Sequence, residues 1–173
     1  EIYEHIRYEG PHIPMASLPG MAERTITISG ASKTFAVTGW RIGWAIAPAA
    51  MTGPIRKVHD FLTVGAPAPL MEAVADALEL LDGGFYRELA GQYHGRRELL
   101  HAALAAAGFG VTRPEGAYYI LADYSALSDL PDPEFARWLT QDIGVAPVPG
   151  SSFFASPDPS RRLVRFAFCK REE

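Results

Sequence analysis

The first part of the chain shows the short-period pattern that is typical of β-strands. Residues 25–29 (Thr-Ile-Thr-Ile-Ser) alternate apolar and polar β-branched side chains, and we expect a strand there. A turn of small residues follows at 30–34 (Gly-Ala-Ser-Lys-Thr), which suits a close approach of the backbone to a ligand. A second apolar run, 42–47, ends at Pro48 and predicts a buried strand. The two strands would therefore flank a loop that carries Lys33.

The middle of the chain follows the longer period of amphipathic helices. Residues 51–62 and 69–81 predict two helices, the second with an apolar stripe along one side. The segment 82–84 (Asp-Gly-Gly) is expected to break the pattern. A long stretch rich in Ala and Leu, 85–107, then predicts a third helix, which Gly108 ends at the position after the C-cap.

Shorter elements follow the long helix. Residues 118–122 and 163–168 predict strands, and 133–141 predicts a helix capped by Asp132. Residues 147–152 contain Pro-Gly-Ser-Ser and predict a loop. Strands that alternate with helices favour an α/β fold class in the first half of the chain and α+β in the second.

Composition and charge exclude several classes of function. The 173 residues are 48% hydrophobic and 21% charged, which is ordinary for a globular protein. The net charge of −4 and the scattered basic residues argue against a nucleic-acid partner or an anionic membrane surface. No apolar run has the length of a membrane span. The single cysteine fits a reducing compartment, so we expect a cytoplasmic location.

One short segment carries residues with clear chemistry. Lys33 leaves the C-terminal end of a predicted strand, which is where open α/β sheets bind ligands. Burial there would favour the neutral amine that imine formation needs, and Arg41 could bind a phosphate in bidentate fashion. A P-loop is excluded, because Ser32 and Thr27 stand where that motif requires glycine. A surface lysine with a structural arginine is the plainer alternative, and the flanking Gly and Trp residues argue against it.

This segment resembles a known family. Residues 32–44, Ser-Lys-Thr-Phe-x-x-Thr-Gly-Trp-Arg-x-Gly-Trp, resemble the pyridoxal-phosphate lysine region of class I/II aminotransferases, the fold-type I family. The family's other motifs are similar to residues 1–4, 114–119, 148–153 and 164–168. The resemblance covers nearly the whole chain and implies the C-terminal part of a family member.

The resemblance implies a fold and a domain organisation. Residues 1–85 would be the later part of the large cofactor-binding domain of the pyridoxal-phosphate transferase fold, which is α/β. Residues 86–173 would be a small α+β C-terminal domain that begins with a long linking helix. The pyridine-binding contacts of the family would lie outside this chain.

The resemblance also implies roles for individual residues. Lys33 would form a Schiff base with pyridoxal 5'-phosphate and act in catalysis. Arg41 would bind the cofactor phosphate, with Ser32 as a further contact, and Tyr3 would donate a hydrogen bond to the phenolic oxygen of the cofactor. Arg165 would pair with the α-carboxylate of the substrate, since a charge in an apolar strand needs a partner. The five histidines have no metal-binding spacing, and we expect no metal site.

The implied activity is transfer of an amino group from an amino acid to a 2-oxo acid by a homodimer. Two alternatives remain open at this point. One is another fold-type I enzyme, a carbon–sulfur lyase or a synthase. The other is the aminotransferase-like effector domain of a transcription regulator. Aspartate, aromatic and other neutral amino acids all remain possible donors.

Overall fold

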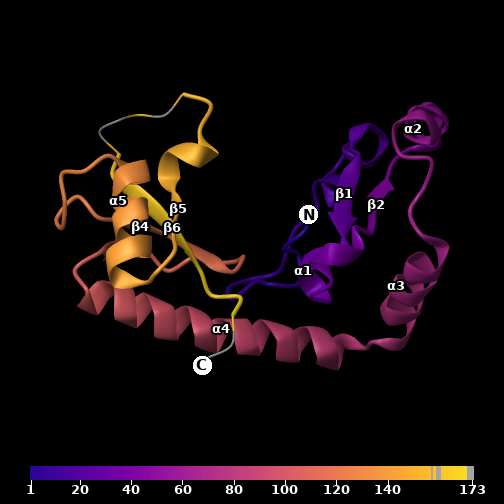
Figure 1. The fold of residues 1–173 in the computed structure, drawn as a ribbon. Helices are drawn as coiled ribbons and strands as arrows, with labels where there is room; N and C mark the ends of the chain where they lie inside the picture. The colour runs from indigo at the N-terminus through magenta and orange to yellow at the C-terminus, as the bar shows by residue number, and fades with distance from the viewer. Residues whose placement is uncertain (157, 159–160, 171–173) are drawn as a thin grey trace. The chain divides into compact units, whose positions relative to one another are not determined.

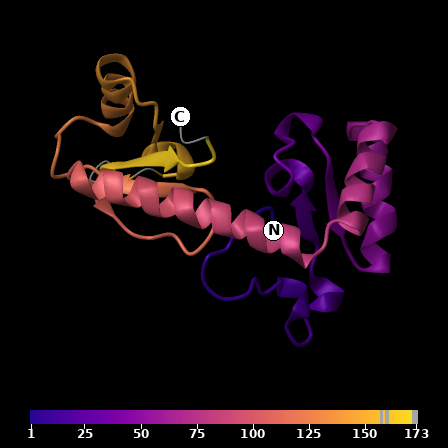
Figure 2. The ribbon, with the colours of Figure 1, turned by 90° about the horizontal axis from the view of Figure 1, so that it is seen from below.

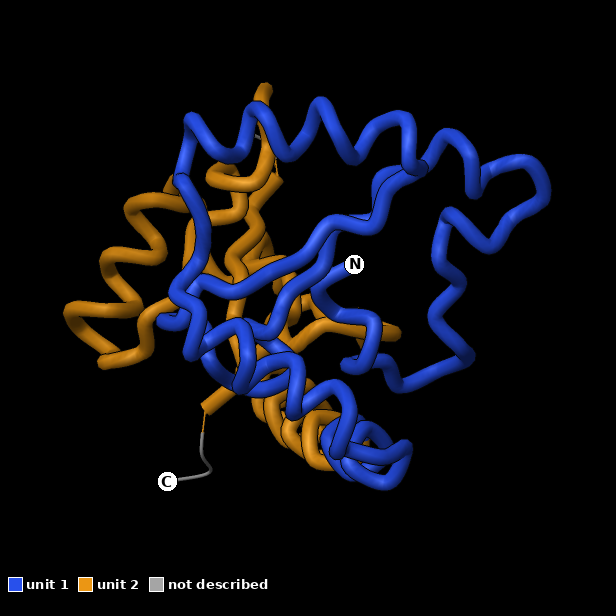
Figure 3. The backbone as a smooth tube through the Cα atoms, turned by 90° about the vertical axis from the view of Figure 1, so that its right-hand side faces the viewer, with its two compact units in different colours: residues 1–90 blue, residues 91–173 orange. Residues whose placement is uncertain are grey.

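The computed structural model describes residues 1–156, 158 and 161–170, and the chain divides into two compact units (Figure 3). The first unit is Glu1–Ala90 and the second is Gly91–Glu173. Helix α4 (Gly83–Ala106) begins in the first unit and ends in the second. None of the helices in the described ranges is long and apolar enough to cross a membrane.

Two short antiparallel strands form the sheet of the first unit (Figure 1). They are β1 (Thr27–Gly30) and β2 (Gly43–Ile46), so both predicted strands are confirmed, although each is shorter than expected. Gly30 pairs with Gly43 at the end of this ladder. A Cβ atom on Gly43 would lie 2.9 Å from the backbone oxygen of Ser29, so this close pairing requires glycine.

Helices α2 and α3 lie on one side of the strand pair in the first unit (Figures 1 and 2). The predicted helices are confirmed as α2 (Ala49–Leu62) and α3 (Ala68–Leu80). The turn expected at 30–34 is instead a single helical turn, α1 (Ala31–Thr34). Three short 3₁₀ helices, η1 (Met15–Ser17), η2 (Ala22–Arg24) and η3 (Thr38–Trp40), complete the unit. Its apolar core consists of the buried residues Ala31, Ile42 and Val74, with Phe35, Val37, Trp44, Ala66 and Leu70 packed against them.

The expected break before the long helix is wrong in detail. The two glycines of the Asp-Gly-Gly segment belong to α4, which starts at Gly83. The Asp82 carboxylate accepts hydrogen bonds from the backbone N–H of Gly84 at 2.7 Å and of Phe85 at 3.3 Å. These bonds satisfy free N–H groups of the first turn and so stabilise the start of the helix. At the other end Gly108 has φ 91°, which confirms its expected role after the helix.

The second unit contains a four-stranded antiparallel sheet in the order β3-β4-β6-β5. The central strands β4 (Tyr119–Asp123) and β6 (Leu163–Ala167) were predicted. The outer strands β3 (Gly110–Val111) and β5 (Val148–Pro149) were not, since each has only two residues. The loop expected at 147–152 therefore includes β5, which runs into the 3₁₀ helix η5 (Gly150–Phe153).

A helix packs on one face of this sheet. It is α5 (Asp132–Trp138), which continues as a π-helical turn, η4 (Leu139–Ile143). Phe135 of α5 stacks on Tyr124 with ring centres 3.9 Å apart, and both side chains are fully buried. The mixture of helices and strands confirms the α/β fold class expected from the sequence.

Asp132 does not cap α5, which corrects a sequence prediction. The residue before the helix is Pro131, and Asp132 is the first helical residue. The Asp132 carboxylate instead accepts a hydrogen bond of 2.6 Å from the backbone N–H of Ser151. Asp132 therefore fixes the start of η5 rather than the start of its own helix.

Candidate active site

The structure places Ser32 and Lys33 on α1, directly after β1. The first residue of α1, Ala31, is buried, and its N–H donates a hydrogen bond of 3.1 Å to the backbone oxygen of Ile42. This bond ties the helical turn to the residue that precedes β2. Ser32 and Lys33 are half-buried at this position.

Arg41 follows η3 and belongs to the same loop system. Its guanidinium donates a hydrogen bond of 3.1 Å to the backbone oxygen of Thr38, whose hydroxyl donates one of 3.0 Å to the backbone oxygen of Ser32. Arg41 has φ 58°, a left-handed conformation that residues with side chains rarely adopt unless their surroundings hold them. Thr38 thus links the arginine to the helical turn that carries Lys33.

Tyr3 lies on a segment that packs against β1. The hydroxyl of the buried residue Ser29 donates a hydrogen bond of 3.0 Å to the Glu4 carboxylate. On the other side of Tyr3, the Cδ1 atom of Ile2 lies 3.5 Å from where a Cβ atom on Gly30 would stand. Tyr3 itself is half-buried. Because its neighbours Ile2 and Glu4 both lie against the end of β1, the backbone of Tyr3 is held close to the point where α1 begins.

The sequence did not predict an acidic cluster beside this segment. Glu1, Glu4 and His12 offer oxygen and nitrogen atoms that all lie within 4.8 Å of one another. The His12 ring lies 3.1 Å from the Glu1 carboxylate, and its hydrogen bond lowers the pKa of that carboxyl group. The histidine has no regular spacing from the acidic residues, so sequence pattern alone could not have paired them. The contact between His12 and Glu1 and the hydrogen bond from Ser29 to Glu4 account for the arrangement.

Arg165 belongs to the second unit, in the middle of β6. It pairs with Leu121 of β4 and Val148 of β5. The guanidinium carbon lies 4.4 Å from the ring centre of Phe153 and 5.2 Å from that of Tyr119. Its Nε atom is buried and has no hydrogen-bond partner within the part of the chain that the structure describes.

The two aromatic contacts of Arg165 were not predicted from the sequence. Neither ring was predicted to have a role: Tyr119 lies in a predicted strand, and Phe153 directly follows the predicted loop 147–152. A usable signal was the alternation of β4 and β6, in which Ile120, Ala122, Val164 and Phe166 are buried. Because alternate residues share a face, Tyr119 and Arg165 lie together on the opposite, more open face. The register between the strands is needed to see this.

The structure therefore groups the predicted site residues into two sets. Tyr3, Ser32, Lys33 and Arg41 belong to the first unit, where a chain of hydrogen bonds links Arg41 to Ser32. Arg165 belongs to the second unit.

Comparison with known proteins identifies relatives for the whole chain. Residues 1–173 match the family described as Aminotransferase class I and II. The chain is 40% identical to a methionine aminotransferase of Escherichia coli (strain K12), and the match covers 99% of this chain and 44% of that protein. It is 37% identical to a kynurenine–oxoglutarate transaminase of Dictyostelium discoideum, over 98% of this chain and 44% of that protein.

Solved structures agree with this result. The crystal structure of the methionine aminotransferase from Escherichia coli superposes with a TM-score of 0.92 at 40% identity, covering 99% of this chain and 45% of that one. The N-succinyldiaminopimelate aminotransferase from Mycobacterium tuberculosis gives the same TM-score of 0.92 and identity of 40%, over 99% of this chain and 44% of that one. The chain thus spans less than half the length of the relatives it matches.

Proposed function

Because the chain belongs to the family of class I and II aminotransferases, we propose that the whole protein transfers an amino group from an amino acid to a 2-oxo acid. The observation that carries this proposal is the segment between β1 and β2, which contains both Lys33 and Arg41. Within it, hydrogen bonds through Thr38 connect Arg41 to the helical turn of Lys33. The cofactor is pyridoxal 5'-phosphate, as in the family. Relatives are named for different amino acids, methionine and kynurenine among them. The proposal therefore covers amino acids as a class and names no single donor.

The residues present fit this cofactor. Its aldehyde needs a primary amine, its phosphate a cation, and its phenolic oxygen a hydrogen-bond donor. Lys33, Arg41 and Tyr3 are residues of these three types within one unit. Arg41 is exposed, and it forms no ion pair with any carboxylate of the described residues, so its charge is available for a phosphate.

Each residue of the first unit then has a distinct task. Lys33 would hold the cofactor covalently and, once released as an amine, would take the proton from the substrate Cα and deliver it to the cofactor carbon, as transfer of the amino group requires. Arg41 binds the phosphate with Ser32 beside it, and Tyr3 donates to the phenolic oxygen. When bound, the cofactor supplies an electron sink for the charge that develops at Cα.

Arg165 of the second unit binds the substrate α-carboxylate in this proposal. Its guanidinium forms no ion pair with a carboxylate of the described residues and lies on the more open face of the strand, which supports the assignment. A charged group in a strand whose neighbours Val164 and Phe166 are buried is costly without a ligand or another attraction to offset it.

The finer organisation is proposed as follows. Residues 1–85 form the later portion of a large cofactor-binding domain, and residues 86–173 form a small C-terminal domain that starts with α4. The antiparallel sheet and α5 of the second unit support the latter. The single Cys169 supports a cytoplasmic location, and the net charge of −4 supports the absence of nucleic-acid partners.

A homodimer is also proposed, and α2 supports it. None of the residues of α2 is buried, and its C-terminal end presents Phe61, which is 94% exposed. Leu62 and Val64 beside it are exposed as well. An apolar patch of this kind is typical of a protein interface. Sedimentation of the whole protein would show a monomer if the proposal is wrong.

The experiment that tests the function is trapping of the cofactor. Borohydride reduction of the whole protein with bound pyridoxal 5'-phosphate should leave the cofactor on Lys33, located by peptide mass spectrometry. Lys33→Ala should abolish both the attachment and the transfer of amino groups. Attachment elsewhere, or wild-type turnover by the variant, would refute the assignment. Release of ammonia with no consumption of a second oxo acid would identify a lyase instead.

A further inference from the structure

Arg165 differs from four other arginines of the second unit in what surrounds its charge, and it shares with Arg96 a contact to an aromatic ring. Those four arginines form ion pairs with carboxylates: Arg97 and Arg113 with Glu98, Arg162 with Asp129, and Arg161 with Asp158. Arg165 forms no ion pair with any carboxylate in the described part of the chain, and its neighbours are aromatic rings. The charge of Arg165 is therefore held without being neutralised.

Two rings contact this guanidinium from opposite flanks of β6. Tyr119 comes from β4, which pairs with one edge of β6, and Phe153 comes from η5, which follows β5 on the other edge. The distances of 5.2 Å and 4.4 Å from ring centre to guanidinium carbon are within the range of cation–π attraction. We call Tyr119 and Phe153 the aromatic clamp.

The clamp leaves a defined part of the guanidinium for a ligand. Among the described residues, the Nε atom is buried without a hydrogen-bond partner. Neither of the two terminal nitrogens is both buried and without a partner. A ligand would therefore meet the terminal nitrogens, whose planar pair matches the two oxygens of a carboxylate. A neutral amide or ester offers no second charged oxygen and would bind more weakly.

We propose that Phe153 and Tyr119 are positioning residues, which hold the guanidinium of Arg165 ready for the carboxylate of the substrate. This inference rests on the proposed function, because it presumes that Arg165 binds substrate. Ring faces attract the cation without competing for its hydrogen bonds, whereas a protein carboxylate at this place would compete with the substrate. The clamp thus favours free carboxylates over their amides and esters.

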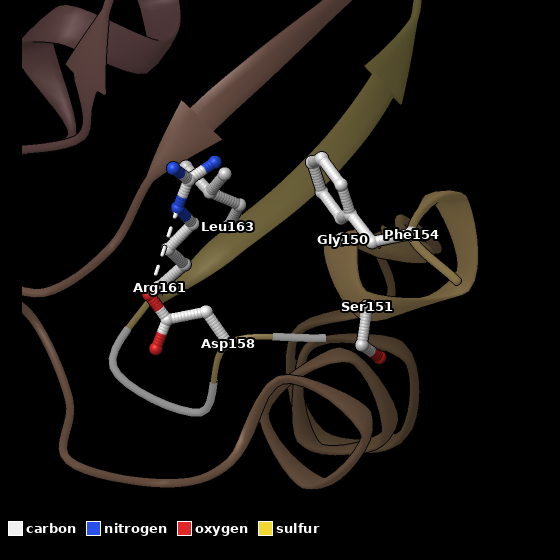
Figure 4. Close-up of a pocket in the computed structure, with 6 residues that line it drawn as sticks. All are labelled: Gly150, Ser151, Phe154, Asp158, Arg161 and Leu163. Atoms are coloured by element: carbon white, nitrogen blue, oxygen red, sulfur yellow. Dashed lines mark ion pairs between the residues drawn. The ribbon is translucent and has the colours of Figure 1, made fainter. Parts of the chain in front are cut away.

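The neighbouring residue Phe154 offers a matched control. Its ring lies 5.8 Å from the guanidinium carbon of Arg161, which pairs with Asp158 at 3.8 Å (Figure 4). Phe154 directly follows the short helix η5, which carries Gly150 and Ser151 (Figure 4). Phe154→Leu removes a ring of the same size from the adjacent position and leaves the surroundings of Arg165 unchanged.

The test uses the whole protein with its cofactor bound. Phe153→Leu should raise the KM for the amino-acid substrate about 2- to 30-fold, the range expected for loss of a cation–π contact. The kcat should stay within about twofold, because Lys33 is untouched. Phe153→Tyr keeps a ring and should restore the wild-type KM, and Phe154→Leu should leave it unchanged.

A binding measurement separates positioning from general damage to the fold. Hexanoate is a carboxylate without an amino group, and its binding can be followed through the absorbance of the bound cofactor. Phe153→Leu should weaken hexanoate by the same factor as KM and leave the weak binding of hexanamide as it is. If Phe153→Leu does not fold, Tyr119→Leu should give the same result, with Tyr119→Phe as its control.

Two outcomes would contradict different claims. If Arg165→Ala raises KM but Phe153→Leu and Tyr119→Leu leave both KM and hexanoate binding unchanged, the clamp is wrong and the role of Arg165 survives. If Arg165→Ala leaves KM unchanged, the proposed role of Arg165 is itself wrong.

Discussion

At the scale of single residues, Gly43 shows how tightly the candidate site is built. A Cβ atom there would lie 2.9 Å from the backbone oxygen of Ser29, so Gly43→Ala must push β2 away from β1. We expect it to lower the free energy of unfolding by about 1–3 kcal/mol, the usual cost of overpacking. It should also weaken cofactor binding, because the strands flank the loop that carries Lys33. Urea unfolding and cofactor titration of the whole protein measure both effects.

Gly39 provides the control for that substitution. It lies in η3, shortly before β2, its φ is not positive, and a Cβ atom on it would have no neighbour within 4 Å. Gly39→Ala should therefore leave stability and cofactor affinity close to wild type. An equal loss from both variants would mean that the close approach of the strands is not the cause.

Arg41 allows a second test at this scale. Hydrogen bonds to a charged group contribute about 1.5–3 kcal/mol, so Arg41→Ala should weaken pyridoxal 5'-phosphate about 10- to 150-fold. Pyridoxal, which lacks the phosphate, should bind the variant and the wild type equally. Titrations with both compounds check this. An equal loss for the two would show that Arg41 does not bind the phosphate.

At the scale of elements, a buried arginine joins α4 to the segment that leads into β4. Arg97 is 3% exposed, and its guanidinium donates hydrogen bonds of 2.9 Å to the backbone oxygen of Pro114 and to Glu98. Arg97→Met keeps the apolar stem and leaves the Pro114 oxygen without this donor. We expect a loss of about 1–3 kcal/mol in the free energy of unfolding, measured with urea.

Arg113 is the matched control for Arg97. It binds the other oxygen of Glu98 at 3.0 Å, but its side chain is exposed. Its hydrogen bond is the main reason why the pKa of Glu98 is lowered. The pair therefore contributes at neutral pH and loses that contribution as the pH falls through the lowered pKa. Arg113→Met should cost much less than Arg97→Met at pH 7, because solvent screens the exposed pair, and an equal cost would contradict the role of burial.

Element length decided which parts of the fold could be predicted. The long helix α4 and the central strands β4 and β6 carry enough residues for a period to be recognised. The two-residue strands β3 and β5 have no period, and they exist because a longer strand pairs with them. Asp132 was misassigned for a related reason, since its carboxylate is used by a segment far away in sequence.

At the scale of the whole molecule, the candidate site was predictable only where it is local in sequence. Lys33 and Arg41 lie in one motif, and Arg165 was indicated by a charge among apolar residues. The rings of Tyr119 and Phe153 meet Arg165 only after three strands have paired in register. Tertiary pairing of this kind leaves no trace in local periodicity.

The length of the relatives leads to the last prediction. The chain covers 44% of the methionine aminotransferase of Escherichia coli, and its first unit has a sheet of only two strands. Ile28 and Ile46 on these strands are 66% and 64% exposed. Two strands alone are marginally stable in water, so we expect the remainder of the protein to cover them. The 173 residues expressed alone should therefore show no or very weak transfer of amino groups.

The second unit also has an apolar surface that we expect the remainder of the protein to cover. An apolar hollow of about 510 Å³ opens between α4, α5 and the sheet, and its lining includes Phe109, Trp138 and Phe166. The isolated chain should bind a fluorescent apolar dye there, and the whole protein should bind much less if additional chain covers the hollow. Transamination assays on both forms complete the test. Turnover by the isolated chain at the rate of the whole protein would mean that these residues alone hold the cofactor and substrate.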